Sequence, residues 1–324
     1  MKAAMVQKPR LILAGGTGYI GKLLTTYFLK QGWDVAVITR QPALRPNDKT
    51  KGPKYVHWDG ETIGDWTKEL EGSDALINLT GKSVNCRYTK RNQDSLVRSR
   101  IQPTRLLGQA VQECVHPPAI WMNASTATLY RHTFDHPWTE NGEIGAHPEA
   151  KDAFSVELAT AWENAFLETD TTGVRKVLLR SAMVLGRQDD ANNVFRVLRR
   201  LTRIGLGGTM GTGNQFVSWV HETDFCRAVE WIIRHPKIGG PVNVAAPTPL
   251  TNREMMQSFR SALGVPIGLP APRWLLEIGA FFLRTETELI LKSRRVISSV
   301  LRENGFTFNY TRMPAAIEDL KAPN

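Results

Sequence analysis

The chain has 324 residues, the length of one large domain or two modest ones, and its hydrophobic content of 42% is enough for a well-buried core. The formal net charge of +10 comes from 41 basic and 31 acidic residues, and the basic residues are scattered along the chain. Scattered basic residues argue against a nucleic-acid-binding protein and favour small anionic ligands.

No segment of the sequence is expected to enter a membrane. No apolar stretch is long enough to span a bilayer, and residues 1–10 lack the apolar core of a signal peptide. The three cysteines are an odd number without metal-ligand spacing, which indicates free thiols in a reducing compartment. We therefore expect a cytoplasmic protein with no membrane partner and no metal site.

A glycine-rich turn organises the start of the chain. The apolar run at residues 11–14 predicts a buried parallel strand, and core spacing predicts a helix over residues 19–31. Between them residues 15–21 read Gly-Gly-Thr-Gly-Tyr-Ile-Gly. A strand, glycine turn and helix in this order predict a dinucleotide site, because the turn brings the pyrophosphate to the helix N-terminus. The residues expected to contact the cofactor here are Gly15, Thr17, Gly18, Tyr19, Ile20 and Gly21.

The second predicted strand ends at Arg40. The residue at this point of a dinucleotide fold faces the adenine ribose, where an arginine accommodates a 2′-phosphate and an acid prefers a 2′-hydroxyl. Arg40 therefore predicts NADP(H) in preference to NAD(H), with Arg45 and Lys49 as reinforcement. The alternative is a solvated basic loop. Asp59, at the end of the third predicted strand, is expected to contact the adenine.

Strands and helices alternate over roughly the first 180 residues, which predicts an α/β fold with a doubly wound parallel sheet. The fourth strand runs into Asn78, Leu79, Thr80 and Gly81, a small and polar segment where the backbone would pass the cofactor. A helix over residues 89–115 is expected to have Pro103 in a first turn. The other elements predicted here are strands at residues 34–39, 54–58, 75–79, 118–124 and 174–180 and a helix at residues 150–168.

The pattern changes after residue 186. A helix over residues 194–203 has arginines opposite its apolar face, for which a solvated surface is the first interpretation and an anion-binding helix the second. The glycine-rich segment 205–221 suggests a loop shaped around a ligand. Gln215 and His221 are its predicted substrate contacts.

These patterns divide the chain into two predicted domains. Residues 1–185 and 218–246 form a Rossmann-like domain that binds NADP(H), because a helix at 222–234 and a strand at 242–245 return to the main sheet. Residues 186–217 and 247–324 form a smaller, mainly helical C-terminal substrate or lid domain, with a short strand expected at residues 306–310.

Four motifs together resemble those of a known superfamily. They are the glycine turn, Ser-Thr-Ala-Thr-Leu-Tyr at residues 125–130, Leu-Arg-Ser-Ala-Met-Val-Leu-Gly at residues 179–186 and Trp-Val-His-Glu-Thr-Asp at residues 219–224. On these residues the chain resembles the extended short-chain dehydrogenase/reductases of the NAD(P)-dependent epimerase/dehydratase superfamily. It is most similar to an atypical branch with a distinctive C-terminal helical domain, through residues 78–81, 99–101, 162–163, 207–215, 246–252 and 305–308.

The resemblance implies a catalytic Ser/Thr, a tyrosine and a lysine four residues after it, with the tyrosinate taking or giving the proton as hydride moves. Thr126 matches the Ser/Thr. Phe154 and Leu158 stand where the tyrosine and lysine are expected, and neither carries a proton. No Tyr-x-x-x-Lys occurs anywhere in the sequence. The chain therefore departs from the usual chemistry, as the atypical branch does.

Other side chains are candidates to replace the missing pair. Tyr130 is a candidate acid/base, although this position is usually structural in the superfamily. Arg100 is interpreted either as a group that binds an anionic substrate or stabilises an enolate, or as part of a buried salt bridge. Cys86 is interpreted first as a structural thiol and second as a reactive one next to Arg87. Helix capping explains His221 better than metal ligation does.

The sequence supports one leading function and two alternatives. The leading hypothesis is an atypical NADP(H)-dependent reductase or epimerase acting on a small anionic or nucleotide-sugar-like carbonyl substrate. The first alternative is a catalytically weak or inactive NADP(H)-binding regulator or scaffold, which would explain the missing pair directly. The second is RNA or DNA binding on a basic Rossmann surface, which the scattered charge disfavours. A homodimer is left open.

Overall fold

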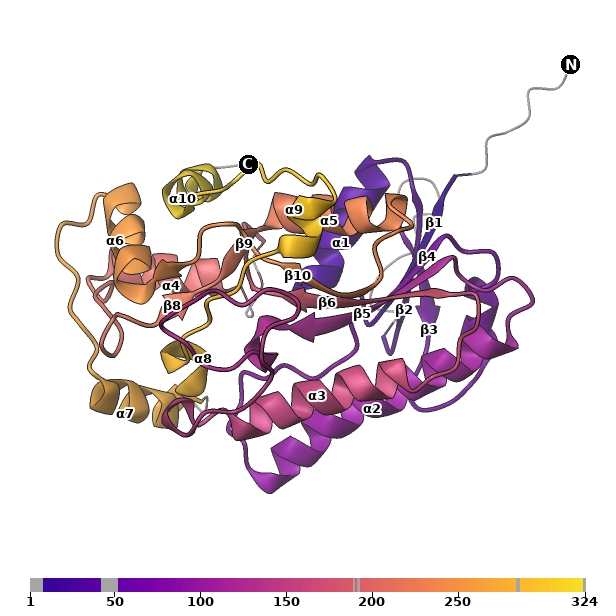
Figure 1. Ribbon diagram of the computed structural model, residues 1–324, viewed down its shortest axis with the longest axis horizontal. Helices are drawn as coiled ribbons and strands as arrows, with labels where there is room; N and C mark the ends of the chain where they lie inside the picture. The colour runs from indigo at the N-terminus through magenta and orange to yellow at the C-terminus, as the bar shows by residue number, and fades with distance from the viewer. Residues whose placement is uncertain (1–7, 42–51, 189, 191–192, 284–285, 323–324) are drawn as a thin grey trace, which may run out of the picture. The chain divides into compact units, whose positions relative to one another are not determined.

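The computed structural model describes residues 8–41, 52–188, 190, 193–283 and 286–322. Its main sheet has seven parallel strands in the order β10-β6-β5-β4-β1-β2-β3 (Figure 1). The chain winds outward from β1 in both directions, which is the arrangement of a doubly wound Rossmann-like fold. The strands are β1 (Arg10–Ala14), β2 (Asp34–Thr39), β3 (Lys54–His57), β4 (Ala75–Asn78), β5 (Ile120–Thr126), β6 (Arg175–Ser181) and β10 (Gly240–Val244).

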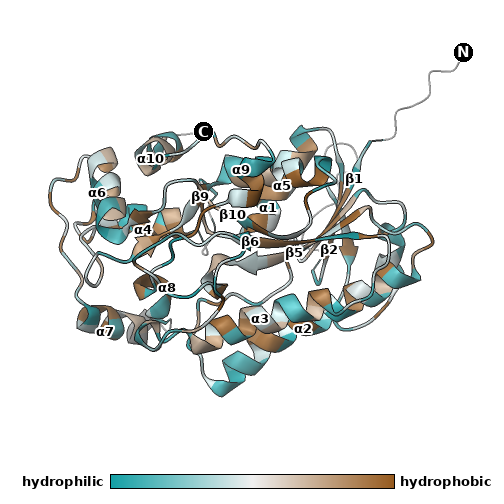
Figure 2. Cartoon of the chain, viewed as in Figure 1, coloured by the Kyte–Doolittle hydropathy of each residue, from teal (hydrophilic) through white to brown (hydrophobic). Residues whose placement is uncertain are grey.

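Strand β1 is buried because it lies between β2 and β4 in the sheet. Leu11, Ile12, Leu13 and Ala14 are 0% exposed. A parallel strand covered on both faces reads as a continuous apolar run, which is why the sequence predicted it. Figure 2 shows hydrophobic residues along the strands of this sheet. The predicted doubly wound parallel sheet is confirmed.

Helices connect the strands of the main sheet and form most of the C-terminal part. The α-helices are α1 (Tyr19–Lys30), α2 (Lys90–Glu113), α3 (Ala153–Leu167), α4 (Val194–Arg203), α5 (Glu222–Arg234), α6 (Asn252–Leu263), α7 (Arg273–Leu283), α8 (Glu288–Leu291), α9 (Ser299–Glu303) and α10 (Met313–Lys321). The shorter elements are the 3-10 helices η2 (Asp65–Glu69), η3 (Ala127–Leu129) and η4 (Pro148–Ala150), and the strand pairs β7 (Met183–Leu185) with β9 (Trp219–His221) and β8 (Phe216–Val217) with β11 (Leu250–Thr251).

Helix α2 continues through Pro103, so the prediction that this proline lies in a first turn is wrong. A proline inside a helix lacks the N–H that would bond to a carbonyl of the preceding turn. Next to it, Thr104 Oγ1 donates to the Arg100 carbonyl (2.7 Å) and accepts from Trp162 Nε1 of α3 (3.0 Å). Helices α2 and α3 run side by side (Figure 1), so Thr104 joins the two helices next to the proline.

Residues 306–310 do not form the predicted strand. The backbone N–H groups of Asn309 and Tyr310 donate to the carboxylate of Asp224, at 2.9 and 2.8 Å. Asp224 lies in α5 and is 0% exposed, so its charge needs these donors. These two backbone groups therefore bond to a buried carboxylate and not to a neighbouring strand. The local sequence could not show this.

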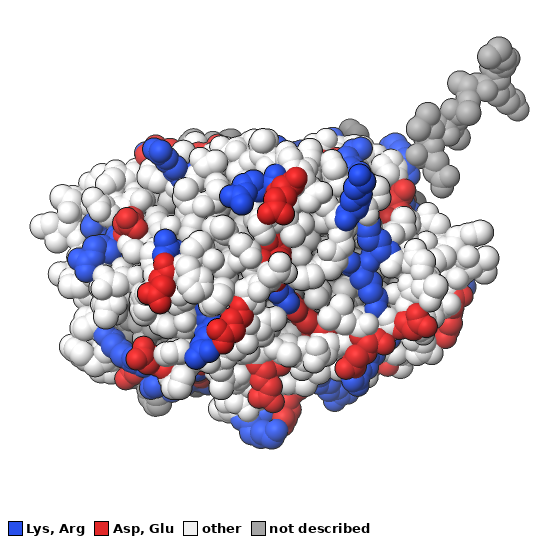
Figure 3. Space-filling model, in the orientation of Figure 1, with Lys and Arg blue, Asp and Glu red and all other residues white. Residues whose placement is uncertain are grey.

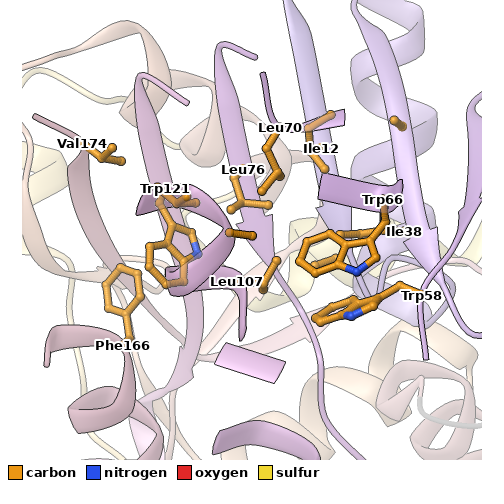
Figure 4. Packing of buried hydrophobic residues seen from close by; sticks show 14 of the residues in the cluster. Ile12, Ile38, Trp58, Trp66, Leu70, Leu76, Leu107, Trp121, Phe166 and Val174 are labelled. Carbon is orange, nitrogen blue, oxygen red and sulfur yellow. The ribbon is translucent and has the colours of Figure 1, made fainter. Parts of the chain in front are cut away.

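The chain forms two compact units. The first consists of Met1–Lys82, Arg98–Ala124 and Trp162–Leu178, as far as these segments are described. Its core contains two aromatic contacts, Trp58 with Trp66 and Trp121 with Phe166, each with ring centroids 4.6 Å apart (Figure 4). Aromatic pairs bury large apolar areas, so these rings stabilise the part of the sheet that carries the glycine turn.

The second unit consists of Ser83–Val97, Ser125–Ala161 and Leu179–Asn324, again as far as described. One of its apolar clusters joins helices α4, α6 and α10 through residues such as Phe195, Phe259 and Ile317. The boundaries of the two units differ from those of the predicted domains. The predicted division concerns which segments bind cofactor and which bind substrate, and it remains a prediction.

Candidate functional site

The glycine turn after β1 is shaped by the backbone around it. Gly15 has φ +72°, a conformation that favours glycine, and its N–H donates to the Ile38 carbonyl at 3.0 Å. A Cβ on Gly15 would lie 3.0 Å from the backbone of Thr80. The turn thus passes directly against the segment that follows β4, and both the dihedral angle and the close approach require glycine.

Gly18 and Gly21 have different structural reasons to be glycine. A Cβ on Gly21 would lie 2.3 Å from the carbonyl oxygen of Gly16, so no side chain fits inside this turn. Gly18 has φ −77°, which any residue adopts, and a Cβ there would meet nothing within 4 Å. The described protein therefore leaves room in front of Gly18, where a dinucleotide fold places the pyrophosphate.

The start of α1 is suited to an anion. Gly18 is the N-cap residue, and within α1, all of which is described, the first turn has neither a capping side chain nor an acidic residue. The first N–H groups of a helix have no partner within the helix, and the dipole adds positive charge at this end. Among the other predicted contacts, Tyr19 is buried whereas Thr17 and Ile20 are partly exposed. The residues present thus fit a bound pyrophosphate.

Arg40 lies directly after β2 and is exposed. The predicted reinforcing residues Arg45 and Lys49 lie outside the described part of the chain. Asp59 follows β3 and orders its own loop, because its carboxylate accepts from the backbone N–H groups of Glu61 and Thr62, each at 2.8 Å. The Thr62 hydroxyl, at 2.6 Å, is the main cause of the lowered pKa of Asp59. Asp59 is therefore an anchored, ionised group at this end of the sheet.

Asn78 fixes the segment that passes the glycine turn. It is 0% exposed, and its Nδ2 donates to Asn123 Oδ1 (2.6 Å) and Thr104 Oγ1 (2.9 Å). Its Oδ1 accepts from the backbone N–H and the hydroxyl of Thr80, at 3.0 and 2.6 Å. Because Asn78 is bonded on all sides, it positions Thr80 and Leu79 and does not itself reach out of the protein.

Arg100 packs against the same segment. Its guanidinium donates to the Lys82 carbonyl at 3.0 Å and lies 5.1 Å from the ring centroid of Trp162. A Cβ on Gly81 would lie 3.1 Å from Arg100 Cζ, so glycine at 81 makes room for the guanidinium. The side chain is only 9% exposed. Arg100 thus places a buried positive charge beside the predicted cofactor segment.

Thr126 and Tyr130 have different environments. The Thr126 hydroxyl accepts from the Thr128 N–H and donates to Thr128 Oγ1, both at 3.1 Å, which caps η3. The Tyr130 hydroxyl donates to Asn243 Oδ1 (2.8 Å) and accepts from Arg180 Nη1 (3.0 Å). Tyr130 is 1% exposed, and burial raises its pKa. These contacts favour a structural role for Tyr130 over an acid/base role.

The two predicted substrate contacts are buried. Gln215 is 2% exposed, and its Nε2 donates to the Met210 carbonyl at 2.8 Å, which holds the glycine-rich loop together. His221 is 1% exposed and caps α5 by accepting from the Thr223 N–H at 3.1 Å. Its other ring nitrogen lies 3.2 Å from Asp319 Oδ2. Both residues shape the loop and the start of α5 from within.

A polar cluster that the sequence did not suggest lies in the second unit, around the N-terminal turn of α8. Its first part joins Tyr88, Ser155 and Glu288. The Tyr88 hydroxyl lies 3.2 Å from Ser155 Oγ and 3.4 Å from Glu288 Oε1, and the Ser155 hydroxyl donates to the same Oε1. Glu288 is 4% exposed, and its Oε2 has no hydrogen-bond partner among the described residues. Burial raises the pKa of Glu288, and it raises the pKa of Tyr88 to about 12.

The second part of this cluster is a buried ion pair. Lys292 and Asp152, both 0% exposed in their side chains, form a salt bridge. Lys292 Nζ also donates to the Thr128 carbonyl at 2.6 Å, and Arg294 Nε donates to Thr128 Oγ1 at 3.1 Å. Burial lowers the pKa of Lys292 and that of Arg294. Hydroxyls, carboxylates and cations thus meet around Thr128, close in the chain to Thr126.

Comparison with known proteins places this geometry in a family. The family model described as the NAD dependent epimerase/dehydratase family matches residues 11–245, more than half of the chain. The chain belongs to this family. A second family model, described as a domain of unknown function (DUF1731), matches residues 271–320, which include α7, α8, α9 and most of α10.

Relatives in the epimerase/dehydratase family match nearly the whole chain. Epimerase family protein Mb2239 of Mycobacterium bovis is 31% identical over 306 residues, which are 94% of this chain and 95% of that protein. Epimerase family protein SDR39U1 of Homo sapiens is 29% identical over 317 residues, 97% of this chain and 100% of that protein. The family resemblance inferred from the motifs is confirmed, including its C-terminal segment.

Solved structures show the same fold. The crystal structure of human SDR39U1 (isoform 2) with NADPH has a TM-score of 0.82 and 27% identity, and the match covers 96% of this chain and 98% of that one. A nucleoside-diphosphate sugar epimerase from Corynebacterium glutamicum has a TM-score of 0.74 and 25% identity, over 97% of this chain and 58% of that one. NADPH in the human relative agrees with the fit of the glycine turn to a dinucleotide.

For this member of the epimerase/dehydratase family, the positions expected to hold tyrosine and lysine lie on α3. Phe154 is partly exposed, and Leu158 is buried at 4% exposure. Neither has an ionisable group. The ring of Tyr88 contacts that of Phe154, with centroids 4.8 Å apart. A phenol is therefore present beside the expected position, although it comes from another part of the chain.

Sequence reasoning missed the cluster because its members are far apart along the chain. The hydrogen bond from Tyr88 to Glu288 joins residues 200 positions apart. The available signal was weak: Ser155 directly follows Phe154, and Glu288 and Lys292 flank a run of only three apolar residues. In the described part of the chain no helix is long and apolar enough to cross a membrane, and no group of three metal-binding side chains is found.

Proposed function

We propose that the protein is an NADP(H)-dependent oxidoreductase or epimerase that acts on a small anionic or nucleotide-sugar-like carbonyl compound. The observation that carries this proposal is the turn around Gly18, where the protein leaves room at an uncapped helix N-terminus. The exposed Arg40 after β2 supports the preference for NADP(H), because an arginine there pairs with a 2′-phosphate. The human relative crystallised with NADPH supports the same preference.

The chain supplies the binding site for the cofactor, and the bound nicotinamide supplies hydride transfer. In this proposal the turn at Gly15, Gly18 and Gly21 holds the pyrophosphate, and Asn78 keeps Thr80 in place beside it. Arg40 holds the 2′-phosphate. Thr126 orients the reacting oxygen of the substrate. To do so, its hydroxyl gives up the hydrogen bond to Thr128 Oγ1 and donates to the substrate.

An anionic substrate is supported by the charge of the protein. The net charge is +10, and Arg100 and Arg294 provide cations next to the segments that carry the family motifs. Figure 3 shows basic and acidic side chains interspersed on the face that it presents, without a broad basic patch there. Binding of a long polyanion requires extended positive surface, so this distribution favours a small anion. The name of the Corynebacterium glutamicum relative supports a nucleotide-sugar-like compound.

A second candidate function is a regulator that binds NADP(H) without turnover. Phe154 and Leu158 favour it, because neither side chain transfers a proton. Binding and turnover separate the two functions. A regulator would bind NADPH and would not oxidise it, whichever carbonyl compound is added. An enzyme would oxidise NADPH in the presence of at least one carbonyl compound.

The test of the proposed function is thermal stabilisation by NADPH, NADP⁺, NADH and NAD⁺ at equal concentrations. A ligand that binds only the folded state raises its stability by RT ln(1 + [L]/Kd), so the order of stabilisation gives the order of affinity. We expect NADPH and NADP⁺ to stabilise the protein most. No shift with any dinucleotide, in protein shown to be free of bound nucleotide, would rule out the proposed function.

A further inference from the structure

We propose that Tyr88 is the proton donor and acceptor of this protein, and that Ser155 and Glu288 form the proton relay behind it. The inference deepens the proposed function and rests on it, because a proton donor needs a reaction in which hydride also moves. It assigns a catalytic role to a residue outside the tyrosine position of the family. Three observations in the second unit support it.

The first observation is where the Tyr88 phenol lies. Its ring packs against Phe154, with centroids 4.8 Å apart and planes at 63°. Phe154 stands where the family resemblance places the catalytic tyrosine. A ring of the right chemistry thus lies against the position from which the hydroxyl is missing. The backbone N–H of Tyr88 donates to Glu286 Oε1 at 2.8 Å, so the loop that carries this ring is anchored.

The second observation is the carboxyl group behind the phenol. Glu288 is only 4% exposed, and its Oε1 accepts hydrogen bonds from the hydroxyl groups of Ser155 and Tyr88. Its Oε2 has no partner among the described residues. A buried carboxyl group with one unsatisfied oxygen is costly unless it is protonated or binds a ligand. The Glu288 carboxyl group is therefore suited to exchange protons with the phenol. A purely structural role would not explain why the protein buries an unsatisfied carboxyl oxygen.

The third observation is that the Thr126 position belongs to the same network. Thr126 bonds to Thr128 Oγ1, which accepts from Arg294 Nε at 3.1 Å, and Arg294 Nη2 donates to the Glu288 carbonyl at 3.4 Å. The two family positions for catalysis, Thr126 and Phe154, are thus both joined to Glu288 by short chains of contacts. A network of this kind holds its members in one geometry.

The charges around the phenol favour its protonated form. Burial raises the pKa of Tyr88 to about 12, against the hydrogen bond to Ser155, which lowers it, and with Glu288, Cys86 and Glu286 as smaller causes that raise it. Burial also raises the pKa of Glu288, against the effects of Ser155, Arg294 and Lys292. Asp152 faces the same cluster and is paired with Lys292. At neutral pH the phenol is therefore protonated, which is the form that the reductive direction needs.

The reductive step balances as follows. The carbonyl carbon of the substrate receives a hydride from the reduced dinucleotide, and the electron pair of the carbonyl bond moves to oxygen. That oxygen takes the proton from Tyr88 Oη and becomes a hydroxyl. The Tyr88 phenolate recovers a proton from the carboxylic acid of Glu288, directly or through the Ser155 hydroxyl, and Glu288 is protonated again from water. In the oxidative direction each transfer is reversed.

The test compares wild type with Tyr88→Phe and Glu288→Gln, and with Tyr27→Phe as a control that removes a phenol from α1. The probes are NADPH with 4-carboxybenzaldehyde, an anionic aldehyde, and benzaldehyde, its neutral counterpart. We expect Tyr88→Phe to lower kcat about 100-fold, the usual scale of general acid catalysis, with the Kd for NADPH unchanged. Glu288→Gln lowers kcat less and removes the fall in kcat at high pH, because glutamine cannot lose the proton. Tyr27→Phe changes neither constant.

A second readout needs no turnover. In protein labelled with 3-fluorotyrosine, the ¹⁹F NMR signal of Tyr88 is the one that disappears in Tyr88→Phe. In this proposal the signal moves when NADP⁺ binds, because the charge of the nicotinamide acts on the group that exchanges the proton. Tyr88→Phe that binds NADPH normally and keeps the wild-type kcat would overturn the inference alone. So would a wild type that binds NADPH, reduces neither aldehyde and leaves the Tyr88 signal in place. Failure of the wild type to bind NADPH would instead overturn the proposed function.

Discussion

The ring of Tyr88 contacts the ring of Phe154 in an edge-to-face arrangement, with centroids 4.8 Å apart. Phe154 lies on α3, where the family resemblance expects a catalytic tyrosine, and Tyr88 lies just before α2. In the second unit, the ring of Phe154, which cannot ionise, is thus in contact with the ring of Tyr88, which can. The loss of the usual pair from the sequence is therefore compatible with proton transfer, because the phenol comes from elsewhere in the chain.

Replacing Arg40 with glutamate should reverse the cofactor preference. A carboxylate accepts hydrogen bonds from a 2′-hydroxyl and repels a 2′-phosphate, so Arg40→Glu should bind NADPH at least about tenfold more weakly and NADH no more weakly than wild type. A tenfold loss corresponds to about 1.4 kcal/mol in binding free energy. Fluorescence titration with the four dinucleotides measures the four Kd values.

The matched control for this change is Arg105→Glu. Arg105 lies on α2 in the same unit, is exposed, and forms an ion pair with Glu168 at 3.9 Å. Both variants replace an arginine with a glutamate, so they alter the net charge by the same amount. Exposed ion pairs contribute little to stability, so this control should fold and bind NADPH as wild type does. An equal loss of NADPH affinity in both variants would show that Arg40 acts only through net charge.

Alanine at Gly18 and at Gly21 should have opposite consequences. A Cβ at 18 meets nothing within 4 Å, so Gly18→Ala should leave the free energy of unfolding unchanged or raise it by about 0.4–1 kcal/mol through the unfolded chain. It should weaken NADPH binding at least about tenfold, because the methyl group occupies the space left for the pyrophosphate. Denaturant unfolding and NADPH titration measure the two effects.

Gly21→Ala is the counterpart. Its Cβ would lie 2.3 Å from the Gly16 carbonyl oxygen, so the turn has to shift. Forcing extra atoms into a packed site costs about 1–3 kcal/mol, and the variant should lose that much stability. If Gly18→Ala proved the more destabilised of the two, or if it bound NADPH as tightly as wild type, the space in front of Gly18 would not belong to the cofactor.

The sequence predicted well those parts of the fold that depend on neighbouring residues. The strand at residues 11–14 is predicted because a buried strand appears in the sequence as an apolar run. The helix at residues 222–234 is predicted because apolar residues recur with the period of an amphipathic helix. The glycine turn was found because its residues are consecutive. Features of this kind are written locally, and the structure changes their bounds by only a few residues.

Distant contacts decide what the sequence could not predict. Next to Pro103, Thr104 of α2 is bonded to Trp162 of α3, and the irregular segment 306–310 donates to the buried Asp224. The polar cluster joins Tyr88 to Glu288 across 200 positions. The periodicity of a sequence carries no information about such pairs, so the prediction missed this cluster of buried charged groups.

Removing the hydroxyl of Tyr130 should affect stability and not the rate of reaction. Tyr130→Phe takes a donor from Asn243 Oδ1 and an acceptor from Arg180, and both of these residues are buried. Leaving buried polar groups short of a partner costs about 1–3 kcal/mol, so the free energy of unfolding should fall by that amount. NADPH-dependent reduction of 4-carboxybenzaldehyde, per folded molecule, should remain within about twofold of wild type, whereas loss of a general acid costs about 100-fold or more. A 100-fold fall in kcat would restore Tyr130 as the acid/base.

His221 should make the stability of the protein depend on pH below its ordinary pKa. Burial lowers the pKa of His221 from 6.5, although Asp319 and Asp224 act in the opposite direction. The unfolded chain therefore binds a proton at His221 more readily than the folded chain does. Its contribution is fully present above pH 6.5 and is lost as the pH falls through the interval between 6.5 and the lower folded value, with a slope of at most about 1.4 kcal/mol per pH unit for one proton.

His221→Asn isolates this contribution, because asparagine also accepts a hydrogen bond at an N-cap and does not titrate. Burial also lowers the pKa of His132, so the wild type contains a second group with the same sign, while the raised pKa of Glu222 acts with the opposite sign. Both groups remain in the variant and cancel in the comparison. Urea unfolding from pH 5 to 7.5 should therefore show a flatter loss of stability in His221→Asn than in wild type. Parallel curves would mean that Asp319 and Asp224 offset the effect of burial, so that the pKa of His221 is the same in the folded and the unfolded chain.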